Sequence, residues 1–160
     1  MRLLLPLRTV FAAAPLFAAA SLALAAAPDT PVAVPNAGFE TAGPTALPSG
    51  WSLDGPATAG STVRRAESGR AGAAAIELEA QTPASLTVLS EPVDLRVGHV
   101  YRLSAWVKTQ GAAADPLARY PTAVAATVAM ASFPFTNHSA AVAGTRDWTR
   151  VETTFVATAA

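Results

Sequence analysis

Apolar and polar residues alternate along several short segments of the chain, and the clearest case runs from His99 to Thr109. Every second residue in this segment is apolar or aromatic, which is the period of a β-strand with one buried face. One face carries Tyr101, Leu103, Ala105 and Val107, and the other carries Arg102, Ser104, Trp106 and Lys108. The alternation predicts a strand whose first row of side chains lies in the core.

Similar alternation predicts three further strands, from Ala73 to Ala80, from Ser85 to Ser90 and from Trp148 to Ala157. In the last of these, Val151 and Phe155 are expected to point inward. Clusters of Gly, Pro, Ser and Asp separate the segments, as turns do. Because many short strands alternate with turns and no convincing amphipathic helix interrupts them, the sequence predicts an all-β sandwich.

The segment from Thr122 to Phe133 is less clear. Its alanine content favours a helix, since alanine is the best helix former. Its β-branched residues, and the prolines at positions 121 and 134, favour a strand. We predict a strand here, in agreement with its neighbours.

The first segment has the order of a secretory signal. Arg2 and Arg8 are followed by an uncharged Leu-, Ala- and Phe-rich run that ends in small residues. We predict a signal peptide over residues 1–25, with cleavage after Ala25 or Ala26, followed by an extended lead-in over 26–35. The alternative is an uncleaved membrane anchor, because the apolar run nears the roughly 20 residues that span a bilayer. Cleavage predicts a secreted protein, extracellular or periplasmic, that is free of the membrane.

Composition narrows the possible functions of the remaining chain. The 160 residues fit one domain, which we place at 36–160, and 11 basic residues balance 11 acidic ones. The sequence has no stripe of basic residues, so it does not predict a nucleic-acid partner. The absence of cysteine excludes disulfides, thiol catalysis and cysteine-based zinc sites.

An enzymatic function finds little support in the sequence. Glu77 and Glu79 share one face of a predicted strand, about 6–7 Å apart along the backbone. That spacing is compatible with an inverting glycosidase, but such enzymes place their acids on opposite sides of the scissile bond. His99 and His138 are far apart in sequence, and no G-x-S-x-G motif is present. We therefore predict a protein that is not an enzyme.

A binding function rests on Trp106, which is predicted to lie on the outer face of its strand. The apolar face of a sugar ring stacks on flat aromatic side chains, while its hydroxyls need polar groups nearby. Trp106, Arg102, Lys108, Tyr120 and Phe135 are the candidate ligand-binding residues. The alternative is that another segment covers this face, which would make Trp106 a packing residue.

With the strands in order, the chain resembles the carbohydrate-binding modules of the family 4/9/16/22 type, which have a galactose-binding-like jelly-roll fold. The matching pieces run from about Asn36 to Ala157 and read "NAGFE", "PSGW", "ESGRAGAAAIEL", "LRVGHVYRLSAWVKT" and "TRDWTRVETTFVA". No single piece is specific, whereas their joint order is. The resemblance implies a non-catalytic module that binds a polysaccharide or oligosaccharide and targets an attached downstream enzyme to it.

The resemblance also bears on the segment from Asn36 to Trp51. Phe39, on an early strand, and Trp51, after a turn-rich loop, are expected to anchor that loop to the core. In many family members the Glu of "GFE", here Glu40, ligates a structural calcium together with an Asp of the closing strand. The chain stops at Ala160 without the aromatic-Asp-Asp-Val-like sequence of that strand. The resemblance thus implies a possible calcium site at Glu40 and a jelly roll that lacks its closing strand.

Two other functions compete with this interpretation. The second hypothesis is a structural or adhesive β-sandwich at the cell surface whose groove is filled, so that it binds protein partners or spaces domains. The third is that the chain is the N-terminal fragment of a larger exported hydrolase.

Overall fold

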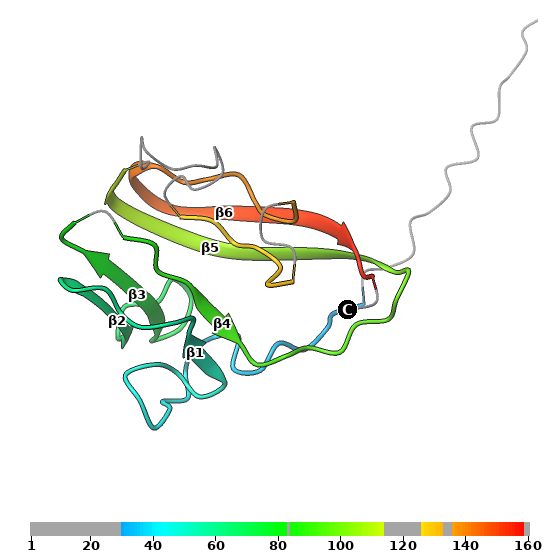
Figure 1. Cartoon of the computed structure of the whole chain (residues 1–160). Coiled ribbons are helices and arrows are strands. Elements are labelled where there is room, and N and C mark those ends of the chain that lie inside the picture. Colours follow the sequence, from blue (N-terminus) through cyan, green and yellow to red (C-terminus); the bar gives the residue numbers. More distant parts are fainter. Residues whose placement is uncertain (1–29, 83, 114–125, 133–135, 159–160) are drawn as a thin grey trace, which may run out of the picture. The chain divides into compact units, whose positions relative to one another are not determined.

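The computed structural model describes residues 30–82, 84–113, 126–132 and 136–158. Within these residues the chain forms six strands and no helix. The strands are β1 (Trp51–Leu53), β2 (Ser61–Ala66), β3 (Ala75–Ala80), β4 (Val88–Ser90), β5 (Val100–Ala112) and β6 (Gly144–Val156). They form antiparallel pairs, β1 with β4, β2 with β3 and β5 with β6 (Figure 1). The predicted all-β class is confirmed, and these small antiparallel sheets are consistent with a β-sandwich.

The contacts divide the chain into two units, Met1–Pro31 and Val32–Ala160. All six strands belong to the second unit. The first unit contributes only Thr30 and Pro31 to the described residues, so the predicted signal peptide lies outside them. In the part of the chain that the structure describes, no helix has the length and apolar character needed to cross a membrane.

The β5–β6 ribbon has the inner face that the sequence predicts. In the first part of β5, Tyr101, Leu103, Ala105 and Val107 are half-buried, and exposed residues stand between them. On β6, Val151 and Phe155 are buried. The rings of Tyr101 and Phe155 face each other across the two strands, with their centroids 6.0 Å apart. These contacts place an apolar layer along one side of the ribbon.

The ribbon is longer than predicted. β5 continues past Thr109 to Ala112, and β6 begins at Gly144 rather than at Trp148. The register shifts between Val107 and Thr109, and again between Thr109 and Ala112. A bulge sets two residues against one and so breaks the two-residue period. The alternation of apolar and polar residues therefore stops at the bulges, although the two strands continue beyond them.

The shorter strand pairs were predicted in part. β3 occupies most of the predicted segment from Ala73 to Ala80, whereas β4 is confined to the end of the predicted segment from Ser85 to Ser90. β2 was missed, although its residues alternate between half-buried and exposed. It pairs with β3 so that Arg64 lies opposite Glu77, and their side chains form an ion pair of 2.6 Å.

The prediction of one strand from Thr122 to Phe133 is wrong for the part of that segment that is described. Residues 126–132 form only isolated bridges, which join Ala126 to Val142 and Ala129 to His138. The buried hydroxyl of Ser139 accepts a hydrogen bond of 3.1 Å from the Val128 N–H. Alanine side chains bury little apolar area, so a strand ladder gains little from them. A few separate backbone hydrogen bonds, together with the bond from Val128 to the Ser139 hydroxyl, hold this segment instead.

The prediction that Phe39 lies on a strand is also wrong. Its φ of 63° is left-handed, and its N–H donates to the Asn36 carbonyl at 2.9 Å, which closes a turn. A strand cannot pass through such a residue. Trp51 does begin β1, and its ring meets that of Phe39 edge to face, with centroids 5.0 Å apart. The two aromatics therefore pack on each other from a turn and a strand.

Candidate functional site

The exposed side of the β5–β6 ribbon carries the residues that the sequence predicts for ligand binding. We call this surface the Trp106 face, and it consists of Arg102, Ser104, Trp106 and Lys108 on β5 with Arg150 and Glu152 on β6. Trp106 lies directly opposite Arg150, and Ser104 lies opposite Glu152. Because Trp106 is 42% exposed, its indole reaches solvent from a regular strand. The prediction that Trp106 lies opposite the core row is confirmed.

The indole of Trp106 is not an open platform, because Arg70 covers part of it. The guanidinium carbon of Arg70 lies 3.4 Å from the centroid of the Trp106 ring. Arg70 comes from the loop between β2 and β3 and is itself exposed. This cation–π contact is favourable and holds the loop against the ribbon. The sequence gives no periodic signal for it, because Arg70 stands in the turn-rich stretch "AESGRAG".

Ion pairs neutralise much of the charge around Trp106. Arg150 pairs with Glu152 at 3.1 Å on the same strand, and Lys108 pairs with Asp147 across the ribbon at 3.4 Å. The backbone N–H of Trp148 and then Lys108 lower the pKa of the Asp147 carboxyl, so this carboxyl stays charged. Both pairs are exposed to solvent, where such pairs contribute little to stability. Their groups remain accessible to a ligand.

The structure brings together three of the five predicted ligand-binding residues. Trp106, Arg102 and Lys108 share the Trp106 face. Tyr120 and Phe135 lie outside the described residues.

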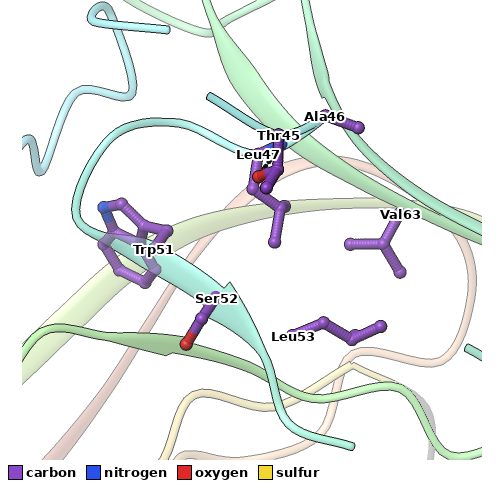
Figure 2. Close-up of a pocket in the computed structure, with 7 residues that line it drawn as sticks. All are labelled: Thr45, Ala46, Leu47, Trp51, Ser52, Leu53 and Val63. Carbon is purple, nitrogen blue, oxygen red and sulfur yellow. Dashed lines mark hydrogen bonds between the residues drawn. The ribbon is translucent and has the colours of Figure 1, made fainter. Parts of the chain in front are cut away.

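An apolar pocket that the sequence did not indicate lies next to the turn-rich loop (Figure 2). It has a volume of about 250 Å³ and opens to solvent. Its lining comes from the loop, from β1 and from β2, and consists of Thr45, Ala46, Leu47, Trp51, Ser52, Leu53 and Val63. Among its lining residues the sequence indicates only Trp51, which is expected to anchor the loop to the core. The lining carries no charged side chain, so the pocket offers apolar contacts and has no charged group for catalysis or for binding an ion.

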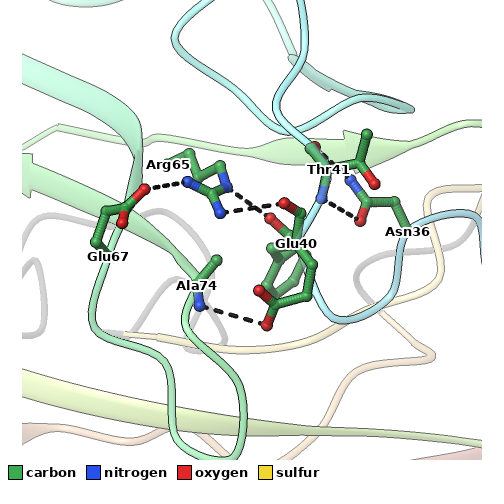
Figure 3. A network of polar contacts seen from close by, with 7 residues as sticks. Asn36, Glu40, Thr41, Arg65, Glu67 and Ala74 are labelled. Atoms are coloured by element: carbon green, nitrogen blue, oxygen red, sulfur yellow. Dashed lines mark hydrogen bonds and ion pairs between the residues drawn. The ribbon is translucent and has the colours of Figure 1, made fainter.

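Glu40 takes part in a network of polar contacts that holds the turn-rich loop (Figure 3). Its carboxylate accepts a hydrogen bond of 3.4 Å from the Ala74 N–H. The same carboxylate lies so close to Gly72 that a Cβ at that position would collide with it. Arg65 donates to the carbonyls of Phe39 at 2.8 Å and of Glu40 at 3.1 Å. Glu40 and Arg65 thus connect the loop to β2 and to the segment before β3.

Asn36 closes the other end of the same loop. Its amide nitrogen donates to the carbonyls of Thr41 at 2.8 Å and Ser49 at 2.9 Å, and its amide oxygen accepts from the Thr41 N–H at 3.1 Å. The indole N–H of Trp51 donates to the carbonyls of Pro35 and Asn36. Side chains therefore satisfy backbone groups that a strand ladder would otherwise satisfy.

The surroundings of Glu40 bear on the predicted calcium ion. Calcium takes six to eight oxygen ligands, mostly carboxylates and carbonyls. The carbonyls of Phe39 and Glu40 already bind the guanidinium of Arg65, which competes with a cation for the same oxygens. Among the described residues, no cluster of three or more acidic, histidine or cysteine side chains surrounds Glu40 or any other point. These two carbonyls do not fit a calcium ion, and calcium at the Glu40 carboxylate stays a prediction.

The acidic pair on β3 is arranged as a surface pair. Glu77 forms its ion pair with Arg64, and Glu79 is exposed opposite Thr62.

Comparison of the chain with protein-family models, with curated proteins and with solved structures finds no match. The function must therefore be argued from the residues of the chain itself.

Proposed function

We propose that this chain is a secreted, non-catalytic carbohydrate-binding module that targets an attached enzyme to a polysaccharide. The observation that carries the proposal is Trp106, a large aromatic 42% exposed on a regular strand among polar and charged side chains. The part of the indole that Arg70 leaves exposed supplies an apolar contact surface, and Ser104 and Lys108 supply hydrogen-bonding groups beside it. A jelly roll of the galactose-binding-like type is part of the same proposal.

Secretion belongs to the proposal as well. The basic, apolar and small-residue order of the first 25 residues supports cleavage of a signal peptide. The intact mass of the protein recovered from outside the cytoplasm tests this, because a mature chain should begin at Ala26 or Ala27. A protein that still begins near Met1 would argue for the membrane anchor instead.

A panel of immobilised polysaccharides tests the binding function. The protein should be retained on at least one of them, and Trp106→Ala should lose that retention. Val156→Ala is the matched control, because Val156 is also exposed on the ribbon but lies at its far end. Circular dichroism must show that all three proteins are folded. Retention that survives Trp106→Ala would place the ligand elsewhere.

The contact between Arg70 and Trp106 favours a second function. An aromatic ring that is already covered by a residue of its own chain is typical of packing, as in a structural or adhesive β-sandwich. Such a module would bind protein partners or space domains. If the folded protein is retained on no polysaccharide, this second function replaces the first.

A structural calcium at Glu40 remains a separate part of the proposal. A metal that binds only the folded state stabilises it by mass action, so a chelator should lower the melting temperature of the unmodified protein. Glu40→Gln should remove this difference between melts with and without chelator. Identical melts of the unmodified protein would leave Glu40 as the acceptor for the Ala74 N–H alone.

A further inference from the structure

The charge of Arg70 has no carboxylate partner in the part of the chain that the structure describes. Other cations near Trp106 are paired, Arg150 with Glu152 and Lys108 with Asp147. Arg70 lies against the ring of Trp106, which attracts it through the negative face of the π-system. Arg70 therefore adds to the Trp106 face an exposed positive group that no described carboxylate neutralises.

The position of Arg70 on the ring decides how it can bind a ligand. At a separation of 3.4 Å the guanidinium must lie roughly flat on the indole, because an upright group would push a nitrogen into the ring. A flat guanidinium keeps the edges that carry its N–H groups in its own plane, pointing away from the ring. Those edges form the planar fork that carboxylate and sulfate oxygens accept in pairs.

The same position works against a neutral sugar. Arg70 covers one face of the indole, so a neutral sugar ring that stacks on this face has to displace it. An anionic glycan has no such need, because it binds the outward edge of the guanidinium while the cation–π contact persists. The stacked tryptophan also restricts the motion of the guanidinium, which reduces the entropy lost when the ligand binds.

We propose that the ligand of the Trp106 face is an anionic polysaccharide, whose carboxylate or sulfate groups are bound by Arg70. This inference rests on the proposed carbohydrate-binding function and names its substrate class. Charge complementarity favours this ligand, since Arg70, which has no carboxylate partner in the described residues, stands over the exposed indole of Trp106.

Matched pairs of polymers test the inference with the full mature chain. The first pair is polygalacturonate and its methyl ester, and the second is dextran sulfate and dextran. Binding to at least one charged member should be about tenfold tighter than to its neutral partner, a difference of about 1.4 kcal/mol. Whichever pair shows the difference identifies the anion as carboxylate or sulfate.

Variants then assign the effect to Arg70. Arg70→Gln should weaken binding to the charged polymer about tenfold. Arg64→Gln is the matched control, because it removes the same charge from an exposed arginine that is paired with Glu77 on β2. The control should change binding less than about twofold, which is under 0.5 kcal/mol. Arg70→Lys should restore only part of the binding, because lysine lacks the planar fork.

Each of the following results would overturn the inference. Equal binding to charged and neutral polymers would show that charge is not recognised. Equal losses in Arg70→Gln and Arg64→Gln, or equally tight binding of single-stranded DNA, would show attraction to any polyanion. Retention on a neutral polysaccharide that does not depend on Arg70 would leave the proposed function standing without this ligand, whereas no retention on any polysaccharide would remove both.

Discussion

The β5–β6 ribbon and the loop from Asn36 to Ser49 are ordered by different interactions. In the ribbon, backbone groups pair with each other over two long strands, and apolar side chains such as Val151 and Phe155 are buried on one face. In the loop, backbone groups pair in short turns and at one isolated bridge, and the side chains of Asn36 and Arg65 donate to four of its carbonyls. The order of the ribbon depends on a repeated alternation of apolar and polar residues, whereas the order of the loop depends on a few particular side chains.

This difference teaches where each region is sensitive to mutation. The ribbon should tolerate changes on its exposed face and fail when an inner residue is truncated. The loop has few buried apolar groups, Leu47 among them, and should fail when one donor to several carbonyls is lost. A ligand site on the exposed face of the ribbon can therefore vary without loss of the fold.

The largest expected effect is that of Phe155→Ala. This residue is buried and faces Tyr101, so its truncation leaves a cavity in the inner layer of the ribbon. We expect the free energy of unfolding to fall by about 3–5 kcal/mol, as for other buried Phe residues. Urea denaturation measures this change. Val156→Ala, at the exposed neighbour, should cost less than about 1 kcal/mol, and equal losses in the two variants would mean that the ribbon has no distinct inner face.

The next effect is expected from Arg65→Met, which keeps much of the side-chain length but removes the donors to the loop. Two carbonyls, of Phe39 and Glu40, lose a charged donor. We expect a loss of about 1.5–3 kcal/mol in the free energy of unfolding. Arg64→Met is the control, because Arg64 is an exposed neighbour with a surface ion pair, and it should cost less than about 1 kcal/mol. If the two variants match, the loop does not depend on Arg65.

The smallest effect is expected at Asp147, at the bulged end of the ribbon. Its pKa is lowered, first by the Trp148 N–H and then by Lys108. Because the pKa is lower in the folded state, the charged carboxylate stabilises the fold when the pH is above the unfolded-state pKa of about 3.9. This contribution disappears as the pH falls through the folded-state pKa. Lys108→Met should raise the pKa of Asp147 without restoring the ordinary value, because the backbone donor remains. An NMR titration of the carboxyl checks this, and an unchanged pKa would exclude a role for Lys108.

The regular part of the fold could be predicted because period-two alternation encodes it directly. Both faces of β5, and the inward positions of Val151 and Phe155, follow from the sequence in this way. The turn at Phe39 could not be predicted, because it depends on a left-handed φ and on the Asn36 carbonyl. The same holds for β2, where two adjacent arginines hide the alternation around Val63.

The candidate site was predictable to the same extent. Trp106, Arg102 and Lys108 lie on one strand, so their common face follows from the strand period alone. Arg70 reaches Trp106 from another loop, and no local pattern relates two residues that far apart in sequence. A contact between distant parts of the chain becomes visible only when the fold is known. The contact of Arg70 with the Trp106 ring was therefore not predicted.

The central claim is that the Trp106 face is a ligand site on a ribbon whose stability does not depend on Trp106. Measurements of stability and of binding on Trp106→Ala test this claim most directly. Trp106 is exposed, so its loss should reduce the free energy of unfolding by less than about 2 kcal/mol, below the 3–5 typical of a buried Trp. Binding to the preferred polysaccharide should weaken about tenfold or more. If Trp106→Ala instead unfolds the protein, or leaves binding unchanged, the claim is contradicted, and the ligand must be sought around Tyr120 and Phe135, the other predicted ligand-binding residues.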